Sequence, residues 1–145
     1  MPGPDFLDTN ILVYAYDPSD PRKQEIARDL VKRALAGESL VSSQVFAELA
    51  TVLLHKTSPR ADPGNVIAVL DVLAPIKQIT SDGDMVRRAV QAHAQYGLHF
   101  YDGMIVAAAE RGGCTRILSE DMNSGQKYFG VLVENPFSVN QNERS

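Results

Sequence analysis

The sequence predicts an α/β fold, a three-layer α/β/α sandwich with a central parallel sheet. Short apolar runs with strand character alternate along the chain with longer segments of helical periodicity. Strands that are joined through helices run parallel, and the helices then cover both faces of the sheet. The chain of 145 residues has no internal repeat, low-complexity tract or domain-sized linker. We therefore expect a single domain at residues 1–138 and a loose C-terminal tail at residues 139–145.

The first half of the chain is expected to begin with a strand and to be rich in helices. In the segment 22–37, apolar residues from Ile26 to Leu35 recur on one helical face, and Gly37 is suited to end the helix. A loop at residues 58–64 separates the last two helices. The expected elements are a strand at 5–7, helices at 11–16 and 22–37, a strand at 39–43, and helices at 44–56 and 65–74.

The second half is expected to contain two further helices and three strands of the sheet. Pro75 ends the preceding helix, and Ser81 or Asp82 is a suitable cap for the next one. The helix at 101–113 is apolar almost all round, so we expect it to be buried. The expected elements are a strand at 76–79, helices at 81–97 and 101–113, a strand at 115–119, a turn at 119–126 and a strand at 131–136.

Composition predicts a cytoplasmic protein without disulfides. Cys114 is the single cysteine and there are three histidines, which argues against both a disulfide and a structural zinc site. The segment MPGPDF lacks the pattern of a signal peptide, and the longest apolar run, MIVAAA, is far shorter than the roughly 20 residues that span a membrane. The net charge of −4, from 14 basic and 18 acidic residues, argues against a generally cationic nucleic-acid surface.

Several basic residues could flank a local groove for RNA. Residues of this kind more often form solvated faces, and the sequence does not distinguish the two roles. The residues are Arg22, Lys23, Arg28, Lys32, Arg87, Arg88 and Lys127.

Four acidic residues are expected to meet at one edge of the sheet. Asp8 and Asp121 each follow directly on a predicted strand. Glu48 lies near the start of a helix that follows another strand, and Asp102 opens the buried helix. Ligand sites of parallel sheets lie beyond the carboxyl ends of the strands. All four acids should therefore point toward one patch.

Each of these acids also has a purely structural explanation. Asp8 and Asp102 could cap helices, Glu48 could belong to the polar stripe of an amphipathic helix, and Asp121 could close an Asx-turn. Independent caps and turns need not share one edge, whereas a metal site requires it. Crowded carboxylates stay ionised together only beside cations. Mg²⁺ or Mn²⁺, which prefer oxygen ligands, would suit this patch and would favour phosphate chemistry.

Four motifs, taken in order, resemble those of the PIN-domain ribonucleases, and most closely those of the VapC toxins of bacterial toxin–antitoxin pairs. They are FLDTN, SSQVFAELATVL, YDGMIVAAAE and LSEDMNSGQ, and the resemblance spans nearly the whole chain. It departs at Gly103, where the family usually has Ala, and Gly near the start of a helix is tolerable.

The resemblance implies a Mg²⁺- or Mn²⁺-dependent ribonuclease that forms a homodimer. It also implies a cognate antitoxin whose C-terminal segment lies across the toxin and delivers an Arg or Lys to the acids. The catalytic metal ligands that it implies are Asp8, Glu48, Asp102 and Asp121, with Thr9 or Asn10 as supporting polar contacts.

The sequence therefore predicts a metal-dependent endoribonuclease that hydrolyses RNA phosphodiesters with water. The main alternative is a non-catalytic RNA-binding or scaffold domain of the same fold. An aspartyl-nucleophile phosphatase is a lesser alternative, because Asn10 replaces the second acid of the D-x-D-x-T pattern. A calcium loop is rejected because Gln126 stands where that motif needs Gly. A Ser-His-Asp triad lacks the G-x-S-x-G elbow.

Overall fold

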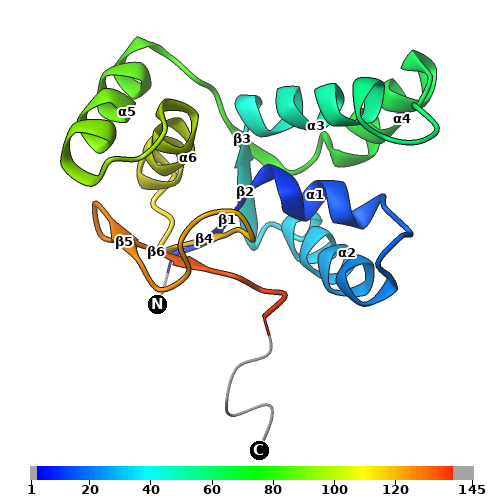
Figure 1. Cartoon of the computed structure of the whole chain (residues 1–145), viewed down its shortest axis with the longest axis horizontal. Coiled ribbons are helices and arrows are strands. Elements are labelled where there is room, and N and C mark those ends of the chain that lie inside the picture. The colour runs from blue at the N-terminus through cyan, green and yellow to red at the C-terminus, as the bar shows by residue number, and fades with distance from the viewer. Residues whose placement is uncertain (1–2, 139–145) are drawn as a thin grey trace, which may run out of the picture.

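The centre of the fold is a six-stranded sheet in the order β3-β2-β1-β4-β6-β5 (Figure 1). The computed structural model describes residues 3–138, so the predicted tail at 139–145 lies outside the described residues. All neighbouring strands are parallel except β5 and β6, which are antiparallel. The strands are β1 (Asp5–Leu7), β2 (Ser39–Ser42), β3 (Lys77–Ile79), β4 (Arg116–Leu118), β5 (Lys127–Tyr128) and β6 (Val131–Glu134).

Helices cover both faces of this sheet and confirm the predicted α/β fold. In Figure 1, α5 and α6 lie on one side of the sheet and α1 to α4 on the other. The helices are α1 (Thr9–Ala15), α2 (Pro21–Leu35), α3 (Ser43–His55), α4 (Pro63–Leu73), α5 (Gly83–Tyr96) and α6 (Phe100–Arg111). Among the described residues, no helix is both long enough and apolar enough to cross a membrane.

Capping side chains set most of the helix starts. Helix α1 begins at Thr9, earlier than predicted, because the Asp8 carboxylate accepts a hydrogen bond from the Thr9 N–H. Helix α4 begins at Pro63, which shortens the predicted loop, because Asp62 caps it and Pro is favoured in a first turn. The cap of α5 is Asp82, one of the two residues that the sequence offered.

The core is formed by the central strands and by α6. Phe6 and Leu7 of β1 are fully buried, and every residue of β2 is buried. Helix α6 has an unbroken buried run from Gly103 to Ala109, which confirms that it is the buried helix. These buried strands fix the positions of the loops that follow them.

Strands β5 and β6 form an antiparallel hairpin, so the sheet is not wholly parallel. The sequence analysis did not predict β5. Strand β5 has two residues, too few for a recognisable alternating pattern. Phe129 and Gly130 turn the chain between the strands with φ of 50° and 84°, and such a conformation is uncommon for an aromatic residue. It is supported by Tyr96, whose hydroxyl oxygen accepts a hydrogen bond from Phe129 N at 3.0 Å.

Candidate active site

The carboxyl ends of β1, β2 and β4 lie at one edge of the sheet, because these strands are parallel neighbours. Asp8 follows β1 directly, and Asp121 lies in the turn after β4. Glu48 lies on α3, which begins at the end of β2, and Asp102 lies in the first turn of α6. The four predicted acids therefore come from four separate segments that converge on this edge.

Asp8 is the buried member of the group, with 7% of its surface exposed. Its carboxylate accepts hydrogen bonds from Thr9 N at 2.8 Å and from Ser119 Oγ at 2.7 Å. Ser119 is itself fully buried, and its oxygen accepts from the backbone N–H groups of Asp121 and Met122 at 3.2 and 3.3 Å. Ser119 thus fixes Asp8 and the start of the turn that carries Asp121. The sequence analysis did not single out Ser119.

Asn10 links two of the acids. Its amide Nδ2 donates to Asp121 Oδ2 at 3.1 Å and lies 3.5 Å from Asp8 Oδ2. Its Oδ1 accepts from the backbone N–H of Glu120 at 3.1 Å. The Asp121 side chain therefore finds its partner 111 positions away in the sequence, which differs from the local Asx-turn that was weighed as an alternative.

Thr9 and Gln44 orient the third acid, Glu48. Thr9 Oγ1 donates to Glu48 Oε1 at 3.0 Å, and Gln44 Nε2 donates to the same oxygen at 3.3 Å. The Gln44 amide also donates to the carbonyl oxygen of Tyr101 at 3.1 Å. Gln44 lies one turn before Glu48 on α3, and the sequence analysis did not single it out.

Asp102 is half-buried in the first turn of α6 and does not cap that helix. The cap is His99, whose ring nitrogen Nδ1 accepts from Tyr101 N at 3.3 Å. The alternative that Asp102 caps this helix is therefore wrong. Burial raises the pKa of Asp102, the charge of His99 lowers it, and the nearby charge of Asp121 raises it.

The four carboxylates lie close enough for their charges to affect one another. Burial is the largest cause that raises the pKa of Asp8, which reaches about 6 although hydrogen bonds from Ser119 and Thr9 lower it. The charges of Glu48 and Asp102 raise the pKa of Asp8 further. Because Asp102 in turn senses Asp121, each acid lies within electrostatic reach of at least one other. Such crowding is relieved by a bound cation.

The donor set suits a divalent cation that keeps much of its water. Carboxylate oxygens are preferred ligands of Mg²⁺ and Mn²⁺. Within residues 3–138, no three acidic, histidine or cysteine side chains stand close enough together to hold one metal ion between them. Mg²⁺ commonly takes only one or two protein carboxylates and fills its other positions with water and phosphate oxygens. At most two such side chains of the described residues could therefore bind one ion directly.

A groove of about 510 Å³ leads from the acids along α1 and α3. Its lining includes four acids, Asp17, Glu48, Glu120 and Asp121, and one basic residue, Lys56. The groove therefore combines the edge of the acidic patch with a positively charged group that could contact a phosphate.

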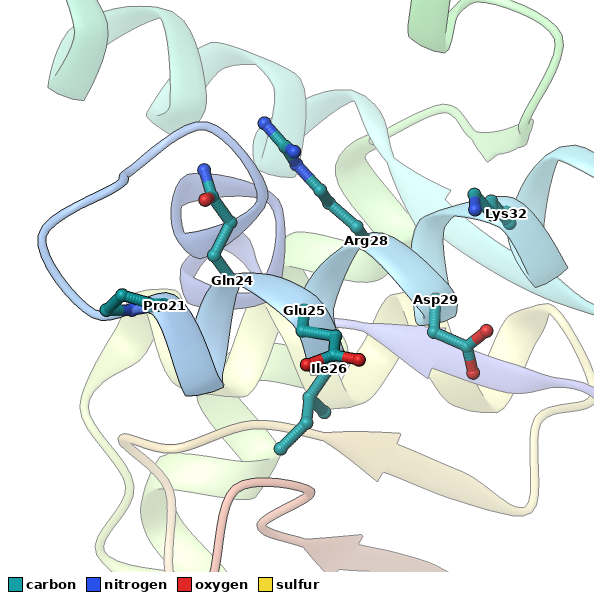
Figure 2. Close-up of a pocket in the computed structure, with 7 residues that line it drawn as sticks. All are labelled: Pro21, Gln24, Glu25, Ile26, Arg28, Asp29 and Lys32. Carbon is teal, nitrogen blue, oxygen red and sulfur yellow. The ribbon is translucent and has the colours of Figure 1, made fainter.

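A second hollow lies along the outer face of α2 and has a different character. Figure 2 shows Glu25, Asp29 and Lys32 projecting from this helix, which alone supplies the lining. Acidic and basic side chains alternate there, and none of the four predicted acids takes part. This surface has the mixed charge of a solvated helix face.

Several of the basic residues considered for RNA binding contact groups of the protein. Lys23 forms an ion pair with Glu120 and lies 4.8 Å from the centre of the Tyr14 ring. Arg88 pairs with Glu110 through two hydrogen bonds of 2.8 Å. Arg22 and Arg28 donate to backbone carbonyl oxygens. These four side chains therefore have structural contacts.

Residues 6–128 match the sequence model of the PIN domain family, and the chain belongs to that family. No protein of curated function matches the chain significantly. The toxin–antitoxin complex from Klebsiella pneumoniae contains a chain of the same fold, at 18% identity and a TM-score of 0.65, with 93% of this chain and 99% of that chain covered.

Two further structures share this fold. The Mycobacterium tuberculosis toxin VapC20, which cleaves the sarcin–ricin loop, is 18% identical with a TM-score of 0.60, over 81% of this chain and 91% of its own. VapBC2 from Rickettsia felis, bound to a promoter DNA fragment, contains a chain that is 20% identical with a TM-score of 0.62, over 90% of this chain and 97% of its own.

Proposed function

We propose that this PIN-domain protein is a metal-dependent endoribonuclease and the toxin of a toxin–antitoxin pair. The observation that carries the proposal is the convergence of Asp8, Glu48, Asp102 and Asp121 on one sheet edge, where the pKa of Asp8 is raised by burial and by its acidic neighbours. A structural set of caps and turns would not crowd four carboxylates at unfavourable cost. The likeness to toxin structures supports the biological role.

The protein side chains would hold the reacting groups in place. Asp8 and Asp121 are the candidate direct ligands of Mg²⁺ or Mn²⁺, with Glu48 and Asp102 acting through water. A divalent ion bound there supplies positive charge for the scissile phosphate and lowers the pKa of a water molecule. Ser119 holds Asp8 in one orientation, and Asn10 does the same for Asp121. Preorganisation of this kind lowers the cost of reaching the transition state.

The nucleophile in this proposal is water, and the ribose 2′-OH takes no part. Cleavage then leaves a 5′-phosphate and a 3′-hydroxyl. The partners that we propose are an RNA substrate, a cognate antitoxin and a second copy of the chain in a homodimer, all in the cytoplasm. We assign the nuclease function to a single domain at residues 1–138.

The decisive experiment is cleavage of single-stranded RNA by the purified protein with and without Mg²⁺. We expect cleavage with Mg²⁺ and none with EDTA. Glu48→Gln and Asp102→Asn should reduce kcat/KM by about 100-fold or more, which corresponds to about 2.7 kcal/mol of transition-state stabilisation. Circular dichroism should show that both variants remain folded.

Glu25→Gln is the matched control, because Glu25 is an exposed acid on the outer face of α2 (Figure 2). It removes one carboxylate without touching the sheet edge, so activity should stay unchanged. Full activity in Glu48→Gln and Asp102→Asn would show that these acids are not part of the catalytic centre. Binding of RNA by the wild type without cleavage would favour the non-catalytic alternative.

A further inference from the structure

Tyr101 is an exposed aromatic residue beside the acidic patch. It directly precedes Asp102 at the start of α6, and 58% of its surface is exposed. Of the large apolar residues left exposed in residues 3–138, it alone carries an aromatic ring. An exposed tyrosine can contact a partner through both its apolar ring and its hydroxyl group.

The ring of Tyr101 is held in place by two aromatic neighbours. It stacks on the imidazole of His99 with ring centres 6.0 Å apart and planes at 29°. Phe100 meets it edge-on at 5.2 Å. The His99 ring is fixed in turn, because its Nδ1 accepts the hydrogen bond from Tyr101 N that caps the helix. The exposed ring is therefore preordered, which lowers the entropic cost of binding a flat partner.

Gln44 couples this ring to the acids. One nitrogen of its amide donates both to the Tyr101 carbonyl and to the Glu48 carboxylate, at 3.1 and 3.3 Å. The amide oxygen of Gln44 is buried and has no hydrogen-bond partner within the described residues. An unsatisfied buried group is rare in folded proteins and calls for an explanation. Gln44 keeps this oxygen unsatisfied while its amide nitrogen links the start of α6 to Glu48.

We propose that Tyr101, backed by His99, stacks on a nucleobase next to the scissile phosphate of single-stranded RNA. This inference rests on the proposed ribonuclease function and names the subsite that would position its substrate. Unpaired bases in RNA are commonly recognised by stacking on aromatic side chains, and every base offers a flat face. The carboxylates can recognise the phosphate only through cations, so a base contact supplies affinity that the acidic patch lacks.

The surface around His99 has room for a further base. His99 borders an apolar hollow of about 310 Å³ whose other lining residues are Val90, His93 and Phe100. Apolar and imidazole groups line this hollow, and none of its lining residues carries a carboxylate that would repel RNA. The stacking surface therefore extends away from the acids along the start of α6.

The test combines protein variants with RNA that lacks one base at a time. Tyr101→Leu keeps an apolar side chain but removes the aromatic face, whereas Tyr101→Phe keeps the face. We expect Tyr101→Leu to raise KM about tenfold, the loss typical of one stacked base, with little change in kcat. Tyr101→Phe should resemble the wild type. Val72→Ala is the control, because Val72 is similarly exposed, at 58%, on α4.

An abasic nucleotide at the stacked position should raise the KM of the wild type to that of Tyr101→Leu, and it should have no further effect on the variant. A 2-aminopurine base at that position should lose fluorescence on binding the wild type but not Tyr101→Leu. This titration reports stacking whether or not the RNA is cut.

Three outcomes would overturn the inference. One is an equal KM for the wild type and Tyr101→Leu. Another is the absence of 2-aminopurine quenching at every position. The third is a change in oligomeric state of Tyr101→Leu by gel filtration, which would assign Tyr101 to a protein interface. Failure of the wild type to cleave any RNA would instead refute the proposed ribonuclease function, and quenching would still report the base contact.

Discussion

At the scale of single residues, Asp8 shows how one side chain serves both structure and the proposed chemistry. It caps α1 through the Thr9 N–H, and it is held by Ser119 Oγ at 2.7 Å in a buried position. Capping alone requires no burial, and Asn or Ser caps about as well. Burial disfavours the ionised carboxylate and so raises the pKa of Asp8 to about 6. At neutral pH this burial makes the metal-free fold less stable. The unfavourable burial is consistent with selection for a site and not for stability.

We predict that Asp8→Asn is more stable than the wild type in EDTA at pH 7.5. The folded pKa of about 6 lies above the ordinary value of 3.8, so the folded state binds a proton more tightly and wild-type stability falls as pH rises from about 4 to 6. Asn carries no such penalty. The expected gain is about 2 to 3 kcal/mol at pH 7.5 and close to zero at pH 4.

Urea denaturation at both pH values measures this difference. Added Mg²⁺ should stabilise the wild type more than Asp8→Asn, because a ligand that binds the folded state raises its stability by mass action. A variant that is less stable than the wild type at pH 7.5 in EDTA would contradict the prediction. It would show that hydrogen bonds to the ionised carboxylate outweigh the effect of its burial.

The placement of the acids at one sheet edge was predictable from the sequence, because each lies at or near the end of a strand or the start of a helix. Their supporting residues were less so. Ser119 is a common residue in a turn, and its role depends on Asp8, from which it is separated by 111 positions. Gln44 and Tyr101 meet across 57 positions. Contacts of this range depend on the packed fold, which local patterns do not specify.

At the scale of elements, the close packing of α5 against α6 explains an unusual glycine. A Cβ atom on Gly103 would lie 2.8 Å from the backbone oxygen of Ala89 and 3.1 Å from its Cα. The sequence analysis considered Gly103 merely tolerable near a helix start. The structure shows that the close approach of α5 leaves no room for the Ala that the resemblance would place there. Helix α6 carries Asp102 in the preceding position, so this contact also sets the site.

Gly103→Ala should therefore destabilise the protein. Overpacking against backbone atoms costs about 1 to 3 kcal/mol, and the better helix propensity of Ala returns up to about 1 kcal/mol. We expect a net loss of about 1 to 2 kcal/mol in urea denaturation. Gly83→Ala is the matched control, because a Cβ there meets nothing within 4 Å, and it should be neutral or slightly stabilising.

The same substitution tests whether α6 positions the site. A displaced α6 would move Asp102, so the kcat of Gly103→Ala should fall while that of Gly83→Ala stays at the wild-type value. If Gly103→Ala were as stable as the wild type, α5 would have to move away from α6 at no cost in stability. The β5–β6 hairpin was not predicted, because β5 has only two residues and because Phe129 in its turn is supported by the distant Tyr96.

At the scale of the whole molecule, an acidic protein is proposed to bind an acidic polymer. The net charge is −4, and several of its basic side chains are engaged within the protein. Binding of RNA then depends on metal ions at the acids, on Lys56 in the adjoining groove and on the stacking surface. The same charge makes the acidic patch a natural target for a cationic segment of another protein. The alternation of strands and helices in the sequence predicted the α/β fold. The binding partner depends instead on the geometry of the surface, which the sequence pattern does not give.

The antitoxin that we propose should compete with Mg²⁺ for this patch. A guanidinium can bridge carboxylates through paired hydrogen bonds and neutralise them without a metal. We expect a small protein, encoded by a gene beside the gene for this chain, to co-purify with it and to place an Arg or Lys at the acids. Its inhibition of RNA cleavage should weaken as the Mg²⁺ concentration rises. Replacement of that partner residue by Ala should relieve inhibition. A partner that binds tightly while cleavage continues at the full rate would refute the competition, and inhibition unaffected by Mg²⁺ would assign the partner to a surface away from the acids.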